Sequence, residues 1–295
     1  MYKSCVTFLI VIFLAFACKI PYSSIPLKVS SAGIAAEIRD TSIKDENHYS
    51  HDNKIYKVGR IFIYDYYYQD KSGNRYQMKL DKSLETIEKK WSELKVDSGY
   101  KGWVFTSTTD DDTNVVKKVK VTVRSGGLEG FQKMDPNYTQ TIIRYDLMIH
   151  NGNSEARGYW EGTGVIENKK NLWVHPPRNK FFEILEINPF PYIKAPYKIG
   201  HSWTWELSIG NHWSDRRWLI WEGRNLHTYK YTITAKVSLK TKLGDLKCYV
   251  VESESNSKIG TTRLTAYFNK KYGFVKLDYT NIDGTKTVMD LEKVE

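Results

Sequence analysis

Cysteine is scarce in this sequence, which has three cysteines in 295 residues. Cys5 and Cys18 lie close to the N-terminus, and Cys248 is the only cysteine beyond them. A single cysteine in the rest of the chain excludes an internal disulfide framework. Because small secreted eukaryotic domains are commonly rich in disulfides, an exported chain with this cysteine usage is better placed in the bacterial envelope.

Long hydrophobic runs are also lacking, because no stretch reaches the about 20 apolar residues that a membrane-spanning helix needs. The mean hydropathy of −0.52 likewise excludes a protein with several membrane spans. Lys3 is followed by one short apolar run, Cys5–Ala17, which ends in small residues. We therefore predict a cleaved signal peptide over residues 1–17, with an uncleaved short anchor as the alternative.

The residues around Cys18 carry two overlapping processing signals. Ala15–Ala17 fits the small-x-small pattern of an ordinary signal-peptidase site. The same stretch with Cys18 resembles a bacterial lipobox, although Ala15 stands where an aliphatic residue is usual and bulky Phe16 follows it. After cleavage Cys18 would otherwise be an exposed thiol in an oxidising compartment, which favours its acylation. We expect diacylglycerol and palmitoyl chains on Cys18 that hold the protein at a membrane.

The charge balance does not indicate a nucleic-acid-binding protein. The sequence has 44 Lys and Arg against 34 Asp and Glu, and loss of Lys3 with the signal peptide reduces the formal net charge from +10 to +9. These charges are spread along the chain, and export separates the protein from nucleic acid, so that partner class is excluded. The excess is typical of a solvated basic surface, which anionic lipid would also attract.

The remaining chain divides into a polar segment and a large domain. Residues 18–54 are polar and irregular, which predicts a flexible tether after the lipidated cysteine. Residues 55–295 are predicted to form a single β-rich domain, with a sub-boundary near residues 150–170 as an alternative. The 41% hydrophobic and 14% aromatic content of the sequence excludes a disordered chain.

Alternation of apolar and polar residues dominates the predicted domain. In residues 61–68, Phe62, Tyr64, Tyr66 and Tyr68 share one face, as in a strand. The same alternation or a short apolar run between turn residues recurs at 115–124, 229–238, 246–253, 263–268, 273–279 and 286–291. We predict a mainly all-β fold, a curved antiparallel sheet in the form of a half-barrel or open barrel, with one amphipathic helix near residues 82–95.

Catalytic signatures are missing from the sequence. It has no zinc-protease motif, no nucleophile elbow, no paired-cysteine motif and no phosphate-binding glycine loop. Cys248 stands between apolar residues of a predicted strand, which indicates an inert buried thiol. His201, His212, Asp215 and Glu222 are possible acid or base groups, but their spacing selects no reaction. We predict no catalytic residue, no metal site and no cofactor.

Tryptophan is concentrated in one part of the chain. Seven of the nine tryptophans lie between residues 160 and 221. Large rings at this density either line a pocket or groove for a lipid tail or sugar rings, or fill the interior of a curved sheet. Next to them, residues 171–192 contain several prolines and aromatic residues and are predicted to form a long irregular connection, either a lid or a structural crossover. The predicted ligand-binding residues are Trp203, Trp205, Trp213, Trp218, Trp221, His175, Tyr64 and Tyr66.

Three segments of the C-terminal part show a strand and turn pattern found in a known family. They are Tyr197–Trp203, Thr241–Val251 and Ala266–Leu277. Over roughly residues 170–294 the sequence resembles a family of exported Gram-negative proteins known as a domain of unknown function. This resemblance implies a curved antiparallel half-barrel without catalytic residues, and similar envelope half-barrels include carriers of lipidated cargo.

The leading functional hypothesis is a lipoprotein of the cell envelope, on the periplasmic or surface face of the outer membrane, that binds a hydrophobic or amphipathic ligand in an aromatic-lined groove. The ligand would be a lipid or a glycan. The alternative is a structural or protein-interaction lipoprotein without a small ligand, and the third hypothesis is a hydrolase of unknown type.

Replacement of Cys18 by serine tests the predicted anchor. A serine hydroxyl is not acylated through sulfur, so Cys18→Ser should lose the mass of the acyl groups and move from the membrane fraction to the soluble fraction. Intact mass spectrometry of both proteins from a Gram-negative host measures this difference. If the variant and the parent differ in mass only by the exchange of sulfur for oxygen, lipidation is contradicted.

Overall fold

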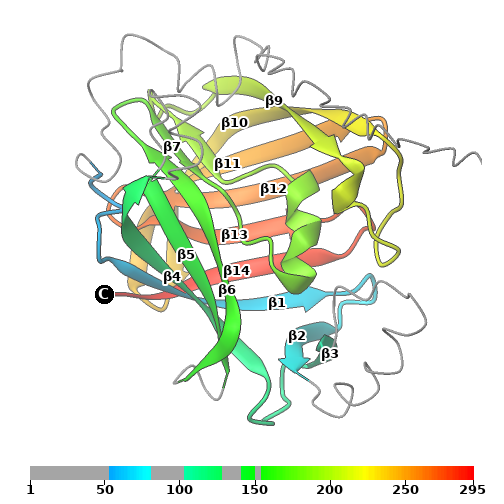
Figure 1. Ribbon diagram of the computed structural model, residues 1–295. Coiled ribbons are helices and arrows are strands. Elements are labelled where there is room, and N and C mark those ends of the chain that lie inside the picture. Colours follow the sequence, from blue (N-terminus) through cyan, green and yellow to red (C-terminus); the bar gives the residue numbers. More distant parts are fainter. Residues whose placement is uncertain (1–52, 81–102, 128–140, 150–153) are drawn as a thin grey trace, which may run out of the picture.

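A computed structural model describes residues 53–80, 103–127, 141–149 and 154–295 (Figure 1). The predicted signal peptide, Cys18, nearly all of the predicted tether and the predicted helix near residues 82–95 lie outside these ranges. Within them, no helix is both long and apolar enough to cross a membrane.

The described residues form one antiparallel sheet, so the predicted all-β fold is confirmed (Figure 1). Its order is β8-β7-β6-β5-β4-β1-β14-β13-β12-β11-β10-β9, with β2 and β3 attached beside β1. The strands are β1 (Ile61–Gln69), β2 (Arg75–Leu80), β3 (Trp103–Ser107), β4 (Val116–Gly127), β5 (Thr141–Ile149), β6 (Ser154–Glu167), β7 (Asn171–Val174), β8 (Tyr192–Lys194), β9 (Ser202–Gly210), β10 (Arg224–Thr241), β11 (Gly244–Ser257), β12 (Gly260–Asn269), β13 (Gly273–Thr280) and β14 (Lys286–Val294).

Side-chain alternation places the apolar residues on the concave face of this sheet. In β1 the four predicted inward residues, Phe62, Tyr64, Tyr66 and Tyr68, are all buried. The seven strand segments predicted from the sequence all lie within β1, β4 and β10–β14, apart from one residue before the start of β4. The C-terminal strand β14 pairs with β1 on one side and β13 on the other. The first and last strands of the described chain are therefore neighbours in the sheet.

Aromatic rings bridge the two edges of the sheet, β8 and β9. Tyr192 of β8 lies 5.4 Å from Trp203 of β9 between ring centroids, in an edge-on arrangement. The indole of Trp205 donates a hydrogen bond to the Tyr231 hydroxyl, which in turn donates to the carbonyl of Phe190 just before β8. The sheet is therefore nearly closed, and packed rings replace backbone pairing at the remaining gap.

A short 3₁₀ helix, η2 (Lys180–Ile187), crosses the concave side of the sheet (Figure 1). Phe182 is fully buried, 5.2 Å from the ring of Tyr66 in β1. At the other end of the helix, the hydroxyl of Thr262 in β12 donates to the carbonyl of Ile187. The irregular connection predicted over residues 171–192 therefore consists of β7, η2 and β8, and its helix fills the interior of the half-barrel.

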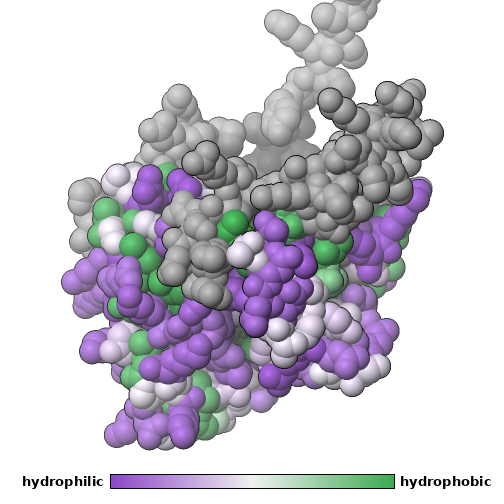
Figure 2. Space-filling model, turned by 90° about the horizontal axis from the view of Figure 1, so that it is seen from below, coloured by the Kyte–Doolittle hydropathy of each residue, from purple (hydrophilic) through white to green (hydrophobic). Residues whose placement is uncertain are grey.

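Strand β1 changes partner along its length, and this opens the sheet at one end. It pairs with β4 from Ile61 to Asp65, but with β2 at Tyr68 and Gln69. The β2–β3 ribbon consequently diverges from the main sheet below β1 (Figure 1). On the face seen from this end, hydrophobic residues are scattered among a majority of hydrophilic ones (Figure 2).

The start of the described chain is tied to the sheet by one buried carboxylate. Glu167, at the end of β6, is 7% exposed and accepts hydrogen bonds from the backbone N–H groups of Lys54, Ile55 and Tyr56 at 2.8 Å each. Backbone donors that point at a carboxylate give charge-assisted hydrogen bonds, which are the strong class. Glu167 therefore fixes the point at which the predicted tether meets the domain.

Replacement of Glu167 by alanine should lower the free energy of unfolding by about 3 kcal/mol, because three backbone N–H groups, two of them buried, lose their acceptor. Urea unfolding followed by tryptophan fluorescence measures this change. Glu252→Ala, at an exposed position of β11, is the matched control and should stay within about 0.5 kcal/mol of the parent. Equal stabilities of the two variants would show that the Glu167 contacts contribute nothing.

Candidate functional site

The candidate site is a pocket of about 390 Å³ at the open end of the half-barrel, beside the divergent β2–β3 ribbon. We call it the aromatic pocket. Its walls come from β1 and the turn after it, β2, β3, η2, the segment before β10, and the β13–β14 turn. The lining residues are Tyr68, Gln69, Asp70, Tyr76, Phe105, Phe181, Ile184, Arg217, Trp218, Asn281, Asp283 and Thr285.

Aromatic rings from separate elements form one continuous wall of the pocket. Phe105 of β3 stacks on Phe181 of η2 with 3.9 Å between ring centroids. Tyr68 of β1 lies 4.9 Å from Phe105, and Tyr76 of β2 lies 6.2 Å from it. Because these rings meet only when β2 and β3 leave the main sheet, the divergence of the ribbon creates the pocket.

Arg217 and Trp218 supply the opposite wall. The guanidinium of Arg217 lies 4.5 Å from the centre of the Trp218 ring and 5.5 Å from that of Phe181. Asp215 fixes the orientation of this guanidinium, because Nε and Nη2 of Arg217 donate hydrogen bonds to the two carboxylate oxygens of Asp215 at 2.6 Å each. Burial lowers the pKa of Arg217 to about 9, so the group is still a cation at neutral pH.

Turn residues place carboxylates at the rim of the pocket. The Oδ1 atom of Asp283 accepts hydrogen bonds from the backbone and the hydroxyl of Thr285 at 3.0 and 2.7 Å. Asp70 accepts from the side chain of Asn74 at 2.9 Å and from the hydroxyl of Tyr76 at 3.1 Å. Hydrogen bonds from Asn74 lower the pKa of Asp70, which is therefore ionised. The pocket thus combines an apolar wall with fixed polar groups, as small-molecule sites commonly do.

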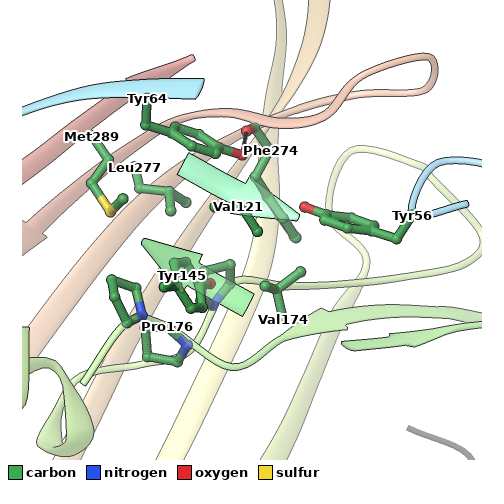
Figure 3. Close-up of a pocket in the computed structure, with 11 residues that line it drawn as sticks. Tyr56, Tyr64, Val121, Tyr145, Val174, Pro176, Phe274, Leu277 and Met289 are labelled. Atoms are coloured by element: carbon green, nitrogen blue, oxygen red, sulfur yellow. Dashed lines mark hydrogen bonds between the residues drawn. The ribbon is translucent and has the colours of Figure 1, made fainter. Parts of the chain in front are cut away.

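A second, much smaller cavity lies on the concave side between β1, β5 and β13 (Figure 3). The hydroxyl of Tyr64 donates to the carbonyl of Phe274 at its edge, at 2.8 Å. Its volume of about 20 Å³ is enough for one water molecule and too small for an organic ligand. A third depression, on the outer face of β1, β2 and β4, is lined largely by charged and polar residues such as Asp65, Arg75 and Lys118.

The predicted site residues are distributed over several places in the fold. Trp203 and Trp205 are buried and stack on Tyr231 and Tyr229, at 5.4 and 4.5 Å between ring centroids. Trp221 is buried beside Ile187 and Ile209 in a separate small cluster. These three tryptophans pack inside the protein and line none of the three described cavities.

The other predicted residues lie in different surroundings, and one of them lines the aromatic pocket. Trp218 lines the aromatic pocket, and Trp213 is partly buried with Arg178 5.9 Å above its ring. Tyr64 lines the small cavity, while Tyr66 packs on η2 and donates its hydroxyl to the carbonyl of Val116.

Several lining residues were absent from the sequence prediction. Tyr68 shares the predicted inward face with Tyr64 and Tyr66, and Phe181 lies in the predicted aromatic connection, so the sequence held a signal for both. Phe105 and Arg217 had none, because only the path of the β2–β3 ribbon and of the segment before β10 brings them to the same pocket.

His175 takes part in a buried acid–base pair on the concave side, away from the pocket. Its Nδ1 atom lies 2.8 Å from the carbonyl oxygen of Pro176, which can only accept, so Nδ1 carries the proton and Nε2 is the bare nitrogen. Nε2 lies 3.4 Å from a carboxyl oxygen of Glu186 in η2. Burial lowers the pKa of His175 to about 3 and raises that of Glu186 to about 8, so both groups are neutral at pH 7.

Two further glutamates near η2 have raised pKa values. Burial raises the pKa of Glu161 to about 7, although the backbone N–H of Arg178 donates to its carboxyl group at 2.7 Å. Burial and the charge of Asp215 raise the pKa of Glu183 to about 7. No set of three or more His, Cys, Asp or Glu side chains arranged to hold a metal occurs in the described ranges.

Comparison with known proteins yields a likeness at the level of the fold. No family model matches the chain, and no curated protein matches it. A structure described as a lipoprotein of Parabacteroides distasonis has a TM-score of 0.40 and 11% identity, covering 83% of this chain and 100% of that one. An exported protein with a YmcC-like fold from Bacteroides fragilis has a TM-score of 0.40 and 9% identity, covering 85% and 99%.

The lipoprotein YmcC of Escherichia coli has a TM-score of 0.31 and 11% identity, covering 60% of this chain and 78% of its own. All three are described as lipoproteins or exported proteins. With TM-scores of 0.40 or less, nothing about the ligand or the location of this chain follows from them.

The buried Glu186 should make stability depend on pH. Its pKa is about 8 in the folded protein and about 4.3 in an unfolded chain, so its stabilising effect is complete below about pH 4.3 and is lost as the pH rises to about 8. Glu186→Gln cannot ionise and should reduce the loss of unfolding free energy between about pH 5 and about pH 8 by about 3 kcal/mol. Urea unfolding at intervals of half a pH unit measures both profiles.

His175 works in the opposite direction, because its neutral folded form loses stability as the pH falls below about 6.5. The difference between the two profiles, rather than the wild-type profile alone, therefore isolates Glu186. Parallel profiles for wild type and Glu186→Gln would contradict a protonated Glu186.

Proposed function

We propose that this protein is an exported lipoprotein, anchored at a membrane of the bacterial envelope through acylated Cys18, whose half-barrel binds an amphipathic ligand in the aromatic pocket. Diacylglycerol and palmitoyl chains would hold the N-terminus in the lipid. Residues 19–52 would then separate the described domain from the headgroups.

The observation that carries the proposal is the construction of the aromatic pocket. Its volume of about 390 Å³ falls within the range of about 300–1,000 Å³ that is usual for small-molecule sites. Phe105 remains 45% exposed, so the pocket wall offers a large apolar ring to a ligand. Five separate rings and one guanidinium are held in place around the same space before any ligand enters.

Preorganisation supports a binding role for the charged groups. Arg217 is fixed by Asp215, and Asp283 is fixed by Thr285, so neither side chain has to be ordered when a ligand arrives. A site whose side chains are already ordered loses less conformational entropy on binding. A purely structural role would not need ionised side chains at the mouth of an apolar cavity, where they are partly removed from water.

Replacement of Trp218 by alanine tests whether the aromatic pocket binds an amphipathic ligand. The neutral fluorescent probe N-phenyl-1-naphthylamine should bind the wild-type protein saturably, and Trp218→Ala should weaken this binding at least about tenfold because one wall is lost. Fluorescence titration measures both dissociation constants.

Trp160→Ala is the matched control, since Trp160 is exposed on β6, lies 4.8 Å from the Arg144 guanidinium and does not line the aromatic pocket. Its probe binding should equal that of the wild type. Equal affinities for all three proteins would place probe binding elsewhere and contradict the proposal.

A further inference from the structure

We propose that the ligand of the aromatic pocket is a neutral saccharide, an inference that rests on the proposed function and names the chemical class of the ligand. Three observations carry it: an unpaired hydroxyl buried in the pocket wall, charged groups of both signs around the pocket, and ring faces beside polar side chains. The first disfavours an acyl chain, the second disfavours an ionic ligand of either sign, and the third fits both the apolar face and the hydroxyl groups of a sugar ring.

The unpaired hydroxyl belongs to Tyr68. Its side chain lines the pocket and is 6% exposed, yet the hydroxyl has no hydrogen-bond partner among the described residues. The hydroxyl of Tyr66, two residues earlier on the same face of β1, donates to the carbonyl of Val116 and accepts from the N–H of Met78. Burial raises the pKa of Tyr68 well above its usual value, so the group is a permanent donor. A ligand oxygen that accepts this proton would satisfy the hydroxyl.

The charges around the pocket disfavour an ionic ligand of either sign. A ligand cation would compete with Arg217, whose guanidinium already lies over the faces of Phe181 and Trp218. A ligand anion would meet Asp70 and Asp283 at the rim, and the charge of Arg217 is already balanced by Asp215. A neutral ligand avoids both conflicts.

The unpaired Tyr68 hydroxyl and the polar side chains at the rim disfavour an alkyl chain, although most of the exposed lining surface is apolar. Six of the twelve lining residues are polar or charged, namely Gln69, Asp70, Arg217, Asn281, Asp283 and Thr285. An acyl chain would remove water from these groups without offering any hydrogen bond in return. It would also leave the Tyr68 hydroxyl unpaired.

A saccharide satisfies all three conditions. The C–H face of a sugar ring is apolar and packs on aromatic faces such as those of Tyr76, Phe105 and Trp218, while each hydroxyl can both donate and accept a hydrogen bond. Sugar hydroxyls can therefore donate to the carboxylates of Asp70 and Asp283 and accept from Tyr68. The source of the sugar is either a free saccharide or a glycan of the envelope.

The test uses the full-length protein in a detergent without a sugar headgroup and measures binding by isothermal titration calorimetry. The panel contains maltotriose, cellotriose and the trimer of N-acetylglucosamine as neutral saccharides, trigalacturonate as an anion, the deacetylated glucosamine trimer as a cation, and palmitate as an acyl chain. Saturable binding confined to one or more neutral saccharides is the expected result. Competition by the matching monosaccharide identifies a free sugar as the source, whereas a requirement for the trimer identifies a glycan.

Tyr68→Phe removes the unpaired hydroxyl and keeps the ring. This variant should bind the neutral saccharide at least about tenfold more weakly while its melting temperature stays unchanged, because no contact within the protein is lost. Tyr145→Phe is the matched control, since its hydroxyl donates to the carbonyl of His175 at 2.8 Å and Tyr145 does not line the pocket. It should melt at a lower temperature and bind the saccharide like the wild type.

The outcomes separate this inference from the proposed function. Binding of palmitate or of a charged trimer, lost in Trp218→Ala, would overturn the saccharide and keep the proposed function. Absence of binding for every member of the panel would overturn the saccharide, and the naphthylamine titration of the wild type and Trp218→Ala would then decide the proposed function. Saccharide binding that neither Tyr68→Phe nor Trp218→Ala weakens would place the sugar outside the aromatic pocket and overturn the inference.

Discussion

Aromatic packing inside a strongly curved sheet is the interaction on which the rest of this structure depends. The edge strands β8 and β9 are not hydrogen-bonded to each other, so the half-barrel has to be closed by side chains. The rings of Trp203, Trp205, Tyr192 and Tyr231 fill that gap, and the Tyr231 hydroxyl links both edges through hydrogen bonds. Large rings suit this place because each buries much area, and the polar atoms of Trp205, Tyr231 and Tyr192 still find hydrogen-bond partners.

Aromatic residues also form the aromatic pocket, at the end of the sheet where β1 pairs with β2. Along β1 the inward tyrosines pack against β4 and η2 until Tyr68, where β4 has been replaced by β2 as the neighbouring strand. Beyond that point the rings of Phe105 and Phe181 have no second layer to bury them and line a cavity instead. The core and the candidate site are therefore one continuous aromatic surface, closed at one end and accessible at the other.

Helix η2 connects the pocket to the interior of the half-barrel. Its residues Phe181 and Ile184 line the pocket, whereas Glu186 faces His175 deep on the concave side. A polar residue in such a place is tolerated because the carboxyl group is protonated and the imidazole is neutral, so no net charge is buried. Glu183 lies between these two regions, with its carboxyl group 3.9 Å from the guanidinium of Arg217 at the pocket wall.

The sequence by itself determined the fold class and most of the strands. Successive side chains of a strand point to opposite faces, so apolar residues at every second position indicate a strand with one buried face. It also placed the aromatic residues correctly on inward faces, as Tyr64, Tyr66, Trp203 and Trp205 show. Only the tertiary structure decided which of these rings fill the core and which line a cavity. That distinction depends on where β1 exchanges β4 for β2, a choice between distant strands that leaves no local pattern in the sequence.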